Sequence, residues 1–445
     1  LTFLEYSRGI FYIGDIPTET MSPKSDEAGD VYQLENWIAN RETEQLQYYF
    51  KYCYIAINRA NTVIDHIQNS SVLSETARRR ILGEAYFLRA WNYFNLVRTF
   101  GIVPVQTKMV AELSQTTPPM ATGLDQLYDL ILGDLTRADN LLEVNKVFGR
   151  ADKVAAQSLM AKAYLTIASS KEHNVHRYTE MRREPRIMYD SAAYWAGKVV
   201  RDYKNVYDFD TNLRDIYDVD KPTGPEHIFI MPIDRSGTQE GNYSKLPLLF
   251  LPSNNSVPFY IRYGNGDLQR ANGNGWGVFL CNDEFVETQF STTDKRRTEL
   301  IHRDIYDASG NPIVPNQVKG YFSSKYVDPN FIGERTSARP YLIRFSDIAL
   351  VYAEAAGPEA GLAYVNRIRE RAGVTPLPSG MTTDKFREAV IKERALELAF
   401  EGNRLYDLRR TASVTTTDIK AAGLSEAEAA YYPIPQREID LNPNL

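Results

Sequence analysis

The sequence has little cysteine, little histidine and no excess of positive charge. Two cysteines, Cys53 and Cys281, and five histidines occur in 445 residues. Two cysteines are too few for a disulfide scaffold or a thiolate metal site. Lysine and arginine together number 51 against 57 acidic residues, which gives a formal net charge of −6. Because no basic field would attract phosphates, we expect no nucleic-acid partner.

Long apolar runs and a targeting segment are also absent. No stretch of eighteen apolar residues occurs, so no segment is expected to cross a membrane as a helix. Residues 1–6 read as the middle of a helix, without an initiator methionine, a basic leader or an apolar leader. We therefore expect a trimmed start, with any targeting segment lying upstream.

Tyrosine, in contrast, is abundant. The chain has 29 tyrosines, and aromatic residues make up 12% of it. Tyrosine has a flat apolar face and a polar edge, which suit recognition surfaces as well as cores. Hydrophobic residues at 43% and charged residues at 24% are ordinary for a globular protein, so a disordered or fibrous chain is excluded.

Apolar residues recur at helical spacing in two blocks, at about 42–205 and 341–410. In the first block Ser74 is a candidate N-cap, and Gly101 followed by Pro104 predicts where that helix ends. The predicted helices are 48–67, 74–101, 124–142, 152–168 and 191–203 in the first block, and 343–356, 359–372 and 384–410 in the second.

Several of these helices carry small residues around a tyrosine, as in L-G-E-A-Y at 82–86 and A-K-A-Y at 161–164. Small residues let paired helices approach closely, and Leu-Gly-x-x-Tyr is part of the tetratricopeptide signature. Tyr86 and Tyr164 are 78 residues apart, however, far from the usual period of about 34 residues. The pattern predicts a mainly α fold of degenerate, tetratricopeptide-like helical pairs with insertions.

Residues 225–340 lack sustained helical periodicity and hold ten of the 26 glycines and nine of the 22 prolines. Short β-type runs alternate there with loops, and a second irregular stretch covers 14–37. Long irregular segments are usually functional or disordered, and the aromatic residues favour an ordered, functional role. The predicted parts are a helical scaffold at 1–224 with a ligand-facing loop at 14–40, an irregular ligand-binding insertion at 225–340, and C-terminal helical pairs at 341–445 that pack back on the scaffold.

Trp276 lies between two glycines in the insertion, so little local sequence is available to bury it. With its aromatic neighbours it predicts a platform for the apolar face of a sugar ring, and polar neighbours would bind the hydroxyl groups. The alternative is that Trp276 anchors the insertion to the scaffold. The candidate ligand-binding residues are Trp276, Tyr260, Tyr263, Phe259, Trp37, Arg262, Asn265, Asp267, Arg270 and Asn272.

One short motif resembles the start of a calcium loop, namely Asp208-x-Asp210-x-Asn212. Leu213 and Val219 stand where an EF-hand needs its glycine and its closing glutamate, so an EF-hand is not expected. P-loop and nucleophile-elbow motifs are absent from the sequence as well. We expect no cofactor and no metal, with a looser structural calcium site as the alternative.

Glu393, Glu397 and Glu401 recur every four residues, which would place three carboxylates on one stripe of the predicted helix 384–410. One interpretation is an acid–base or metal site. The interpretation that we favour is a structural ion-pair network with interleaved arginines. The expected partners are Arg394, Arg404, Arg409 and Arg410.

Seven motifs follow one another along most of the chain. They are G-E-A-Y-F-L-R-A at 83–90, F-G-I-V-P-V at 100–105, the segment 155–165, Y-L-I-R-F to Y-A-E-A at 341–355, V-N-R-I-R-E-R-A-G at 365–373, E-R to E-G-N-R-L-Y-D-L-R-R at 393–410, and Y-P-I-P-Q-R-E-I-D-L-N-P-N at 432–444. In this order they resemble the SusD/RagB family, the outer-membrane nutrient-binding lipoproteins of Bacteroidota.

The resemblance implies a surface lipoprotein built on four tetratricopeptide-like helical pairs, an α/α superhelix, with an irregular subdomain that carries the ligand site. Such a protein would capture oligosaccharides for a SusC-like TonB-dependent transporter and would not hydrolyse them. It would be held at the extracellular face of the outer membrane by an N-terminal lipid anchor. The family's lipidated cysteine is missing from this sequence, so the anchor is inferred from the resemblance alone.

The shared motifs are scaffold motifs in the family, so the resemblance transfers no ligand-contacting residue to this chain. RagB-like members make a peptide cargo the main alternative to a glycan. A helical carbohydrate-active hydrolase is the less favoured alternative, because it needs two carboxylates facing a cleft. Asp283 and Glu284 are adjacent, and the resemblance places them at the start of a structural helix.

Overall fold

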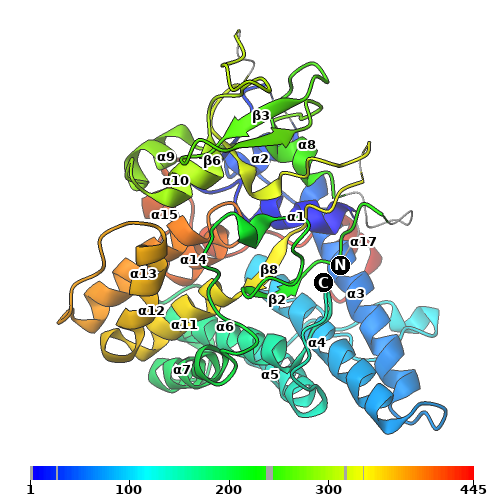
Figure 1. The fold of residues 1–445 in the computed structure, drawn as a ribbon. Coiled ribbons are helices and arrows are strands. Elements are labelled where there is room, and N and C mark those ends of the chain that lie inside the picture. Colours follow the sequence, from blue (N-terminus) through cyan, green and yellow to red (C-terminus); the bar gives the residue numbers. More distant parts are fainter. Residues whose placement is uncertain (1–3, 27–28, 237–243, 315–317, 334) are drawn as a thin grey trace.

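The computed structural model describes residues 4–26, 29–236, 244–314, 318–333 and 335–445. Helices form most of the regular structure (Figure 1). Their bounds are α1 Leu4–Gly14, α2 Asp30–Glu35, α3 Glu44–Ile67, α4 Glu75–Phe100, α5 Leu124–Leu141, α6 Lys153–Glu172, α7 Pro185–Asp202, α8 Leu246–Phe250, α9 Asp283–Gln289, α10 Lys295–Leu300, α11 Phe345–Ala356, α12 Pro358–Arg371, α13 Thr383–Glu397, α14 Arg404–Arg410, α15 Val414–Thr417, α16 Glu426–Ala430 and α17 Gln436–Leu441.

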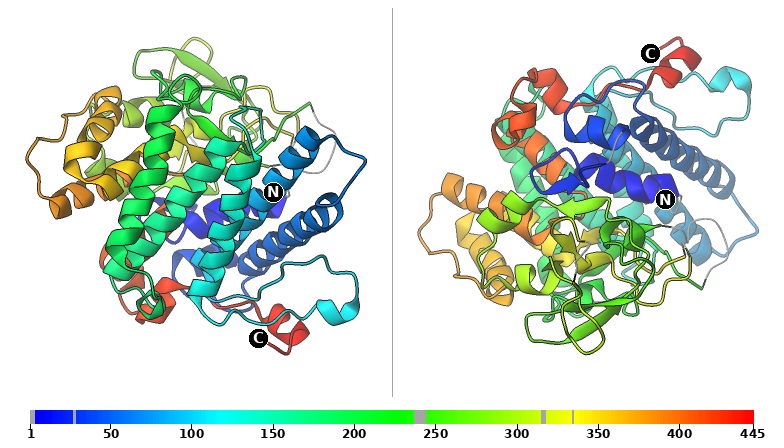
Figure 2. Two further views of the ribbon diagram at one scale, coloured as in Figure 1. Left: turned by 90° about the horizontal axis from the view of Figure 1, so that it is seen from below. Right: turned by 90° about the horizontal axis from the view of Figure 1, so that it is seen from above.

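The long helices of the first block are confirmed within a few residues, except that α7 begins six residues before its predicted start. Ser74 accepts a hydrogen bond from the Ala77 N–H and caps α4, while Gly101 follows the last residue of α4 with a φ of 75°. Helices α3 to α7 lie side by side as an array of neighbouring pairs (Figure 2). At Gly83 an added Cβ would lie 2.6 Å from Leu142 Cγ, so a small residue is needed where α4 meets the end of α5.

The predicted helix 384–410 is wrong as a single element. Helix α13 ends at Glu397, and α14 begins at Arg404. The intervening turn contains Phe400 with a φ of 64° and Gly402 with a φ of 76°, both in the left-handed region that ends a helix. Glu401 therefore lies in the turn, and the three glutamates do not share one helical stripe.

The strands are short and pair two by two. They are β1 Met21–Pro23, β2 His227–Ile230, β3 Phe259–Arg262, β4 Leu268–Ala271, β5 Phe279–Cys281, β6 Ile301–His302, β7 Phe322–Ser323 and β8 Tyr341–Arg344. The antiparallel pairs are β1–β5, β2–β8, β3–β4 and β6–β7. Ile343, predicted at the start of a helix, lies in β8, because the first turn of α11 begins at Phe345.

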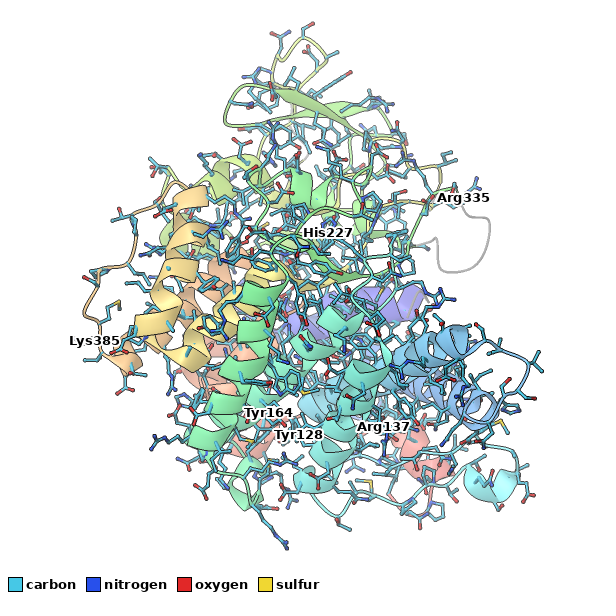
Figure 3. The ribbon with its side chains drawn as sticks, turned by 60° about the horizontal axis from the view of Figure 1, so that its bottom comes forward. Tyr128, Arg137, Tyr164, His227, Arg335 and Lys385 are labelled. Carbon is cyan, nitrogen blue, oxygen red and sulfur yellow. The ribbon has the colours of Figure 1, made fainter. Side chains whose placement is uncertain are left out.

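These strand pairs connect parts that are distant in sequence. Strand β1, from the N-terminal irregular stretch, pairs with β5 of the insertion, with Met21 opposite Cys281. Strand β2 pairs with β8 at the foot of α11. In Figure 3, His227 of β2 lies between the helical part, marked by Tyr128 and Tyr164, and the irregular part. The division into three parts remains a prediction, but these pairs tie the parts together.

The apolar core has two unequal components. The larger cluster runs through the helical pairs and reaches β2, β5 and β8. A smaller cluster lies inside the insertion, beneath the β3–β4 hairpin, which forms the top of the view in Figure 1. Its buried members are Leu251, Phe259, Ile261, Tyr263, Ala271, Ile305, Phe322 and Val327. The hairpin is thus a supported platform with one covered face and one open face.

Candidate functional site

The β3–β4 hairpin separates the predicted site residues into two sets. Side chains alternate along a strand, and directly paired residues share a face. Phe259 and Ile261 point into the small core, whereas Tyr260 and Arg262 lie on the opposite face. Arg270 pairs with Tyr260 and shares its outer face. Phe259 is fully buried, so this placement counts against it as a ligand contact.

The outer face also includes a residue that the sequence analysis missed. Tyr306 forms two backbone hydrogen bonds with Tyr260, of 2.8 and 2.9 Å, as an isolated antiparallel bridge. Tyr306, Tyr260 and Arg270 therefore form one row across three strand segments. The Arg262 guanidinium lies 4.2 Å from the centre of the Tyr306 ring. No local signal identifies Tyr306, since the strand register that aligns it with Tyr260 forms between segments more than forty residues apart.

Tyr263 lies on the inner side of the hairpin. Its hydroxyl donates a hydrogen bond to Gln269, and the Arg214 guanidinium lies 4.5 Å from its ring centre. Burial raises the pKa of Tyr263 to about 12. The ring borders a hollow of about 320 Å³ between the hairpin and the segment 212–220, with Gln269, Asp218 and Asp220 among its lining residues. Tyr263 is only 6% exposed, so most of its surface is covered by its neighbours.

The polar residues of the hairpin turn hold the turn itself. Asn265 accepts a hydrogen bond from the Asp267 N–H and donates one of 2.6 Å to the Asp267 carboxylate. Asp267 also pairs with Arg214 at 3.1 Å. These contacts lower the pKa of Asp267, the Asn265 hydrogen bond contributing first. Beyond the hairpin, Asn272 accepts a hydrogen bond from the Asn274 N–H.

Trp276 is held at the surface by a backbone with little freedom. The residue is 43% exposed, and its backbone N–H donates a hydrogen bond to the Leu248 carbonyl at 2.6 Å. A Cβ added to Gly275 would lie 2.0 Å from the Leu251 carbonyl oxygen, and one added to Gly273 would lie 2.0 Å from that of Val257. The glycines therefore permit close packing of the backbone. An exposed indole on a fixed backbone suits a sugar-binding platform.

The N-terminal irregular stretch forms a backbone hydrogen bond close in sequence to Trp276. The Lys24 N–H donates to the Val278 carbonyl at 3.2 Å, two residues beyond Trp276. Trp37 lies elsewhere. It is buried, its indole N–H donates to Asp418 at 3.2 Å, and its ring stacks on Tyr432. The contacts of Trp37 are with the C-terminal part of the chain and do not bring it to Trp276.

The carboxylate network is structural, as predicted, but its partners differ from those expected. Arg344 is 1% exposed and contacts Glu226 at 2.6 Å, Glu397 at 3.3 Å and Glu401 at 2.7 Å. Burial alone would raise the pKa of Glu401, but Arg344 and Lys325 lower it below its usual range. The other ion pairs of the three glutamates among the described residues are Glu393 with Arg296 and Arg369, Glu397 with Arg371 and Arg296, and Glu401 with Lys325.

The four arginines named as partners contact other groups. Arg394 contacts Asp347 at 2.8 Å and Asp407 at 2.9 Å, which joins α13 to α11 and α14. Arg410 pairs with Asp407 and Glu354, Arg404 with Glu19, and Arg409 lies over Tyr432.

The segment 208–212 forms a turn that also contacts distant parts of the chain. Asp210 accepts a hydrogen bond from the Asn212 N–H, and Asp208 pairs with Arg367 at 3.2 Å. Within the residues that the structure describes, no group of three or more histidine, cysteine, aspartate or glutamate side chains is arranged to hold a metal ion. Across the same residues, no helix combines the length and apolarity needed to cross a membrane.

Two family models match opposite ends of the chain. One is described as the SusD family and matches residues 304–445. The other is described as starch-binding associating with outer membrane and matches residues 13–165. Together they cover more than half of the sequence. The chain belongs to the SusD family. A curated relative, SusD-like protein P2 of Formosa agariphila, is 24% identical to this SusD-family chain over 85% of it and 74% of the relative.

Solved structures share the SusD fold over nearly the whole chain. A SusD superfamily protein from Parabacteroides distasonis has a TM-score of 0.79 at 22% identity, covering 98% of this chain and 92% of its own. A laminarin-binding SusD-like protein has a TM-score of 0.76 at 22% identity, covering 99% and 93%. A structure with a xylogluco-oligosaccharide has a TM-score of 0.76 at 19% identity, covering 100% and 96%. At these identities the likeness shows the fold, and it confirms the mainly α class.

Proposed function

We propose that this SusD-family protein binds oligosaccharides or polysaccharides at the outer membrane and passes them, uncleaved, to a SusC-like TonB-dependent transporter. The half-exposed indole of Trp276 is the observation that carries the proposal, since it stands on a backbone fixed by Gly273 and Gly275. A rigid aromatic surface loses little conformational freedom when a sugar ring stacks on it. Family membership supports the same proposal, because two structural neighbours are described with laminarin or a xylogluco-oligosaccharide.

A binding role without hydrolysis is supported by the state of the carboxylates. A glycosidase needs two carboxyl groups that flank a substrate in a cleft. Glu393, Glu397 and Glu401 are at most 4% exposed and face arginine or lysine side chains. Asp283 and Glu284 lie in the first turn of α9, which Asn282 caps. Neither set offers a carboxylate pair arranged for that chemistry.

The transporter partnership and the lipid anchor rest on family membership. One family model is described as associating with the outer membrane, which supports an outer-membrane location. We propose that a lipid anchor lies upstream of residue 1. Co-purification of the full-length protein with a transporter encoded beside it, and its release from membranes by a lipoprotein-cleaving enzyme, would test the two points separately.

The first experiment is affinity gel electrophoresis against laminarin, xyloglucan and a wider panel of polysaccharides, with reducing-sugar release measured on the same samples. Retardation by a glycan without release of sugar is the expected result. Release of sugar would contradict the non-catalytic role. Retardation by none of the glycans would contradict glycan binding and favour the peptide cargo of RagB-like members.

Replacing Trp276 with alanine should weaken binding of the retained glycan about tenfold, roughly 1.4 kcal/mol, because the stacking surface is lost. Tyr194→Ala is a matched control, since Tyr194 is 54% exposed on the surface of α7. Both variants should keep the thermal midpoint of the wild type within a few degrees, because both side chains are exposed. Equal affinity of Trp276→Ala and Tyr194→Ala would remove Trp276 from the site.

A further inference from the structure

The outer face of the β3–β4 hairpin combines two tyrosines with two arginines. Tyr260 and Tyr306 are half-buried and adjacent through their backbone bridge, and Arg262 and Arg270 are exposed on the same face. Side chains alternate along β3, so Phe259 and Ile261 point into the core while Tyr260 and Arg262 lie on this outer face. The outer face of the hairpin is therefore a surface supported by a packed core, with two aromatic rings and two positive charges.

The two guanidinium groups bind neutral backbone oxygens. Arg262 donates to the Gly310 carbonyl, and Arg270 donates to the Pro329 carbonyl at 2.9 Å. Neither has an ion-pair contact with a carboxylate among the residues that the structure describes. Both positive charges thus remain uncompensated at short range, while each side chain is oriented by a fixed contact.

Nearby acidic residues do not neutralise this face through direct contact. Asp307 is occupied in its own turn, where it accepts hydrogen bonds from the Ser309 and Asn311 N–H groups. Asp304, exposed two positions before Tyr306, forms no ion pair with either arginine of the described hairpin. Asp304 and Asp307 both carry negative charge beside this face, but neither pairs directly with Arg262 or Arg270, so both guanidinium groups are left without a carboxylate partner among the described residues.

Resting on the proposed glycan-binding function, we propose that this hairpin face binds acidic sugars, with uronic-acid residues as the ligand class. A planar guanidinium matches a sugar carboxylate through two parallel hydrogen bonds. The tyrosine rings offer apolar surface to the sugar ring, and their hydroxyls offer hydrogen bonds. In this proposal Tyr306 is a ligand-binding residue, together with Tyr260. The hairpin face is a different surface from the Trp276 indole, which follows the end of β4 in the sequence.

The test compares polygalacturonate oligosaccharides with uncharged laminarin oligosaccharides of similar length by titration calorimetry. Arg262→Gln and Arg270→Gln should each weaken polygalacturonate binding about tenfold and leave binding of the uncharged glycan unchanged. Arg262→Lys should have an intermediate effect, because it keeps the charge and loses the two-pronged geometry. Arg186→Gln is the matched control, since Arg186 is an exposed arginine on α7 and its loss changes the net charge equally.

The salt dependence of binding and a tyrosine variant provide a second, independent measurement of the proposed site. Raising NaCl from about 0.05 M to about 0.5 M should weaken binding of polygalacturonate and leave that of the uncharged glycan nearly unchanged. Tyr306→Ala should weaken polygalacturonate binding, while thermal melting of each variant verifies folding. The proposal would be contradicted if the loss of affinity across the variants correlated with the drop in melting midpoint and not with which side chain was replaced.

The outcomes separate this inference from the proposed function. If uncharged glycans bind in a Trp276-dependent way and polygalacturonate does not bind, the hairpin inference is wrong and the proposed function stands. If the arginine variants match Arg186→Gln on polygalacturonate, the hairpin face is not the acidic-sugar site. If neither kind of glycan binds, both proposals fail.

Discussion

Asp15 is a buried carboxyl at the end of α1 whose environment favours its neutral form. One carboxylate oxygen accepts the Gly402 N–H at 2.6 Å, and the other has no hydrogen-bond partner in the described structure. Burial raises the pKa of Asp15 to about 7, with a further contribution from the negative charge of Glu401. An ionised Asp15 is therefore unfavourable in the folded protein.

Asp15 should make the protein less stable as pH rises toward neutrality. Between about pH 4 and pH 7 the folded protein holds this proton while the unfolded chain has lost it, so the free energy of unfolding falls as pH rises. Asp15→Asn keeps an acceptor for the Gly402 N–H and cannot ionise. At pH 8 we expect it to exceed the wild type in stability by at most about 4 kcal/mol.

Urea unfolding of both proteins at pH 5 and pH 8 checks this expectation. The advantage of Asp15→Asn should be present at pH 8 and should shrink or reverse at pH 5. A difference between the two proteins that is the same at both pH values would show that Asp15 does not titrate in this range.

The site residues show which properties of single positions could be predicted from the sequence. The sequence correctly indicated that Trp276 would be little covered, because glycines flank it and provide no side-chain packing. The burial of Trp37 could not be predicted from the sequence, because its partners Asp418 and Tyr432 lie almost four hundred residues away. Whether Tyr260, Tyr263 and Asn272 touch a ligand remains a prediction.

At the scale of elements, the turn between α13 and α14 is shaped by its contact with α1. A Cβ added to Gly402 would lie 2.3 Å from Ile10 Cγ2, and one added to Gly14 would lie 2.3 Å from the Gly402 carbonyl oxygen. The two backbones thus meet without side chains between them. Helical periodicity through 384–410 predicted an uninterrupted helix, since the apolar pattern continues across the turn and the close approach that breaks it is tertiary.

Replacing Gly402 with alanine should therefore destabilise the protein by about 2–4 kcal/mol, through both the left-handed backbone and the clash with Ile10. Gly380→Ala is the matched control, because Gly380 has a φ of 78° and nothing within 4 Å of its added Cβ. The control should lose only about 1 kcal/mol, the backbone contribution. Equal losses of unfolding free energy in urea would show that the contact with α1 is unimportant.

At the scale of the whole molecule, buried ion pairs join the insertion to the C-terminal helical block. Arg344, at the end of β8, contacts Glu226 beside β2 and Glu397 at the end of α13. Lys325, from the insertion, contacts Glu401 at 2.6 Å. A buried charge is tolerated when its partners are close and hydrogen-bonded, so these groups specify how the distant segments dock.

Arg344→Met should lower the free energy of unfolding by about 3–5 kcal/mol, because it leaves several buried carboxylates with one cation fewer. Arg367→Met is the control, since Arg367 pairs with Asp208 at the surface and should contribute less than about 1 kcal/mol. Thermal melting followed by circular dichroism, with limited proteolysis in parallel, checks this. A melting midpoint of Arg344→Met equal to that of the control would contradict a docking role for the network.

The sequence by itself determined most of the long helices, the Ser74 cap of α4, the mainly α class, the SusD family and the structural role of the three glutamates. Each depends either on spacing within a few residues or on the order of motifs along the chain, and both are present in the sequence before any tertiary contact forms. The tertiary structure alone decided the break after Glu397, the ion-pair partners, the burial of Trp37 and the row formed by Tyr306, Tyr260 and Arg270. Each of these depends on contacts between distant segments, whose geometry is set only when the whole core is packed.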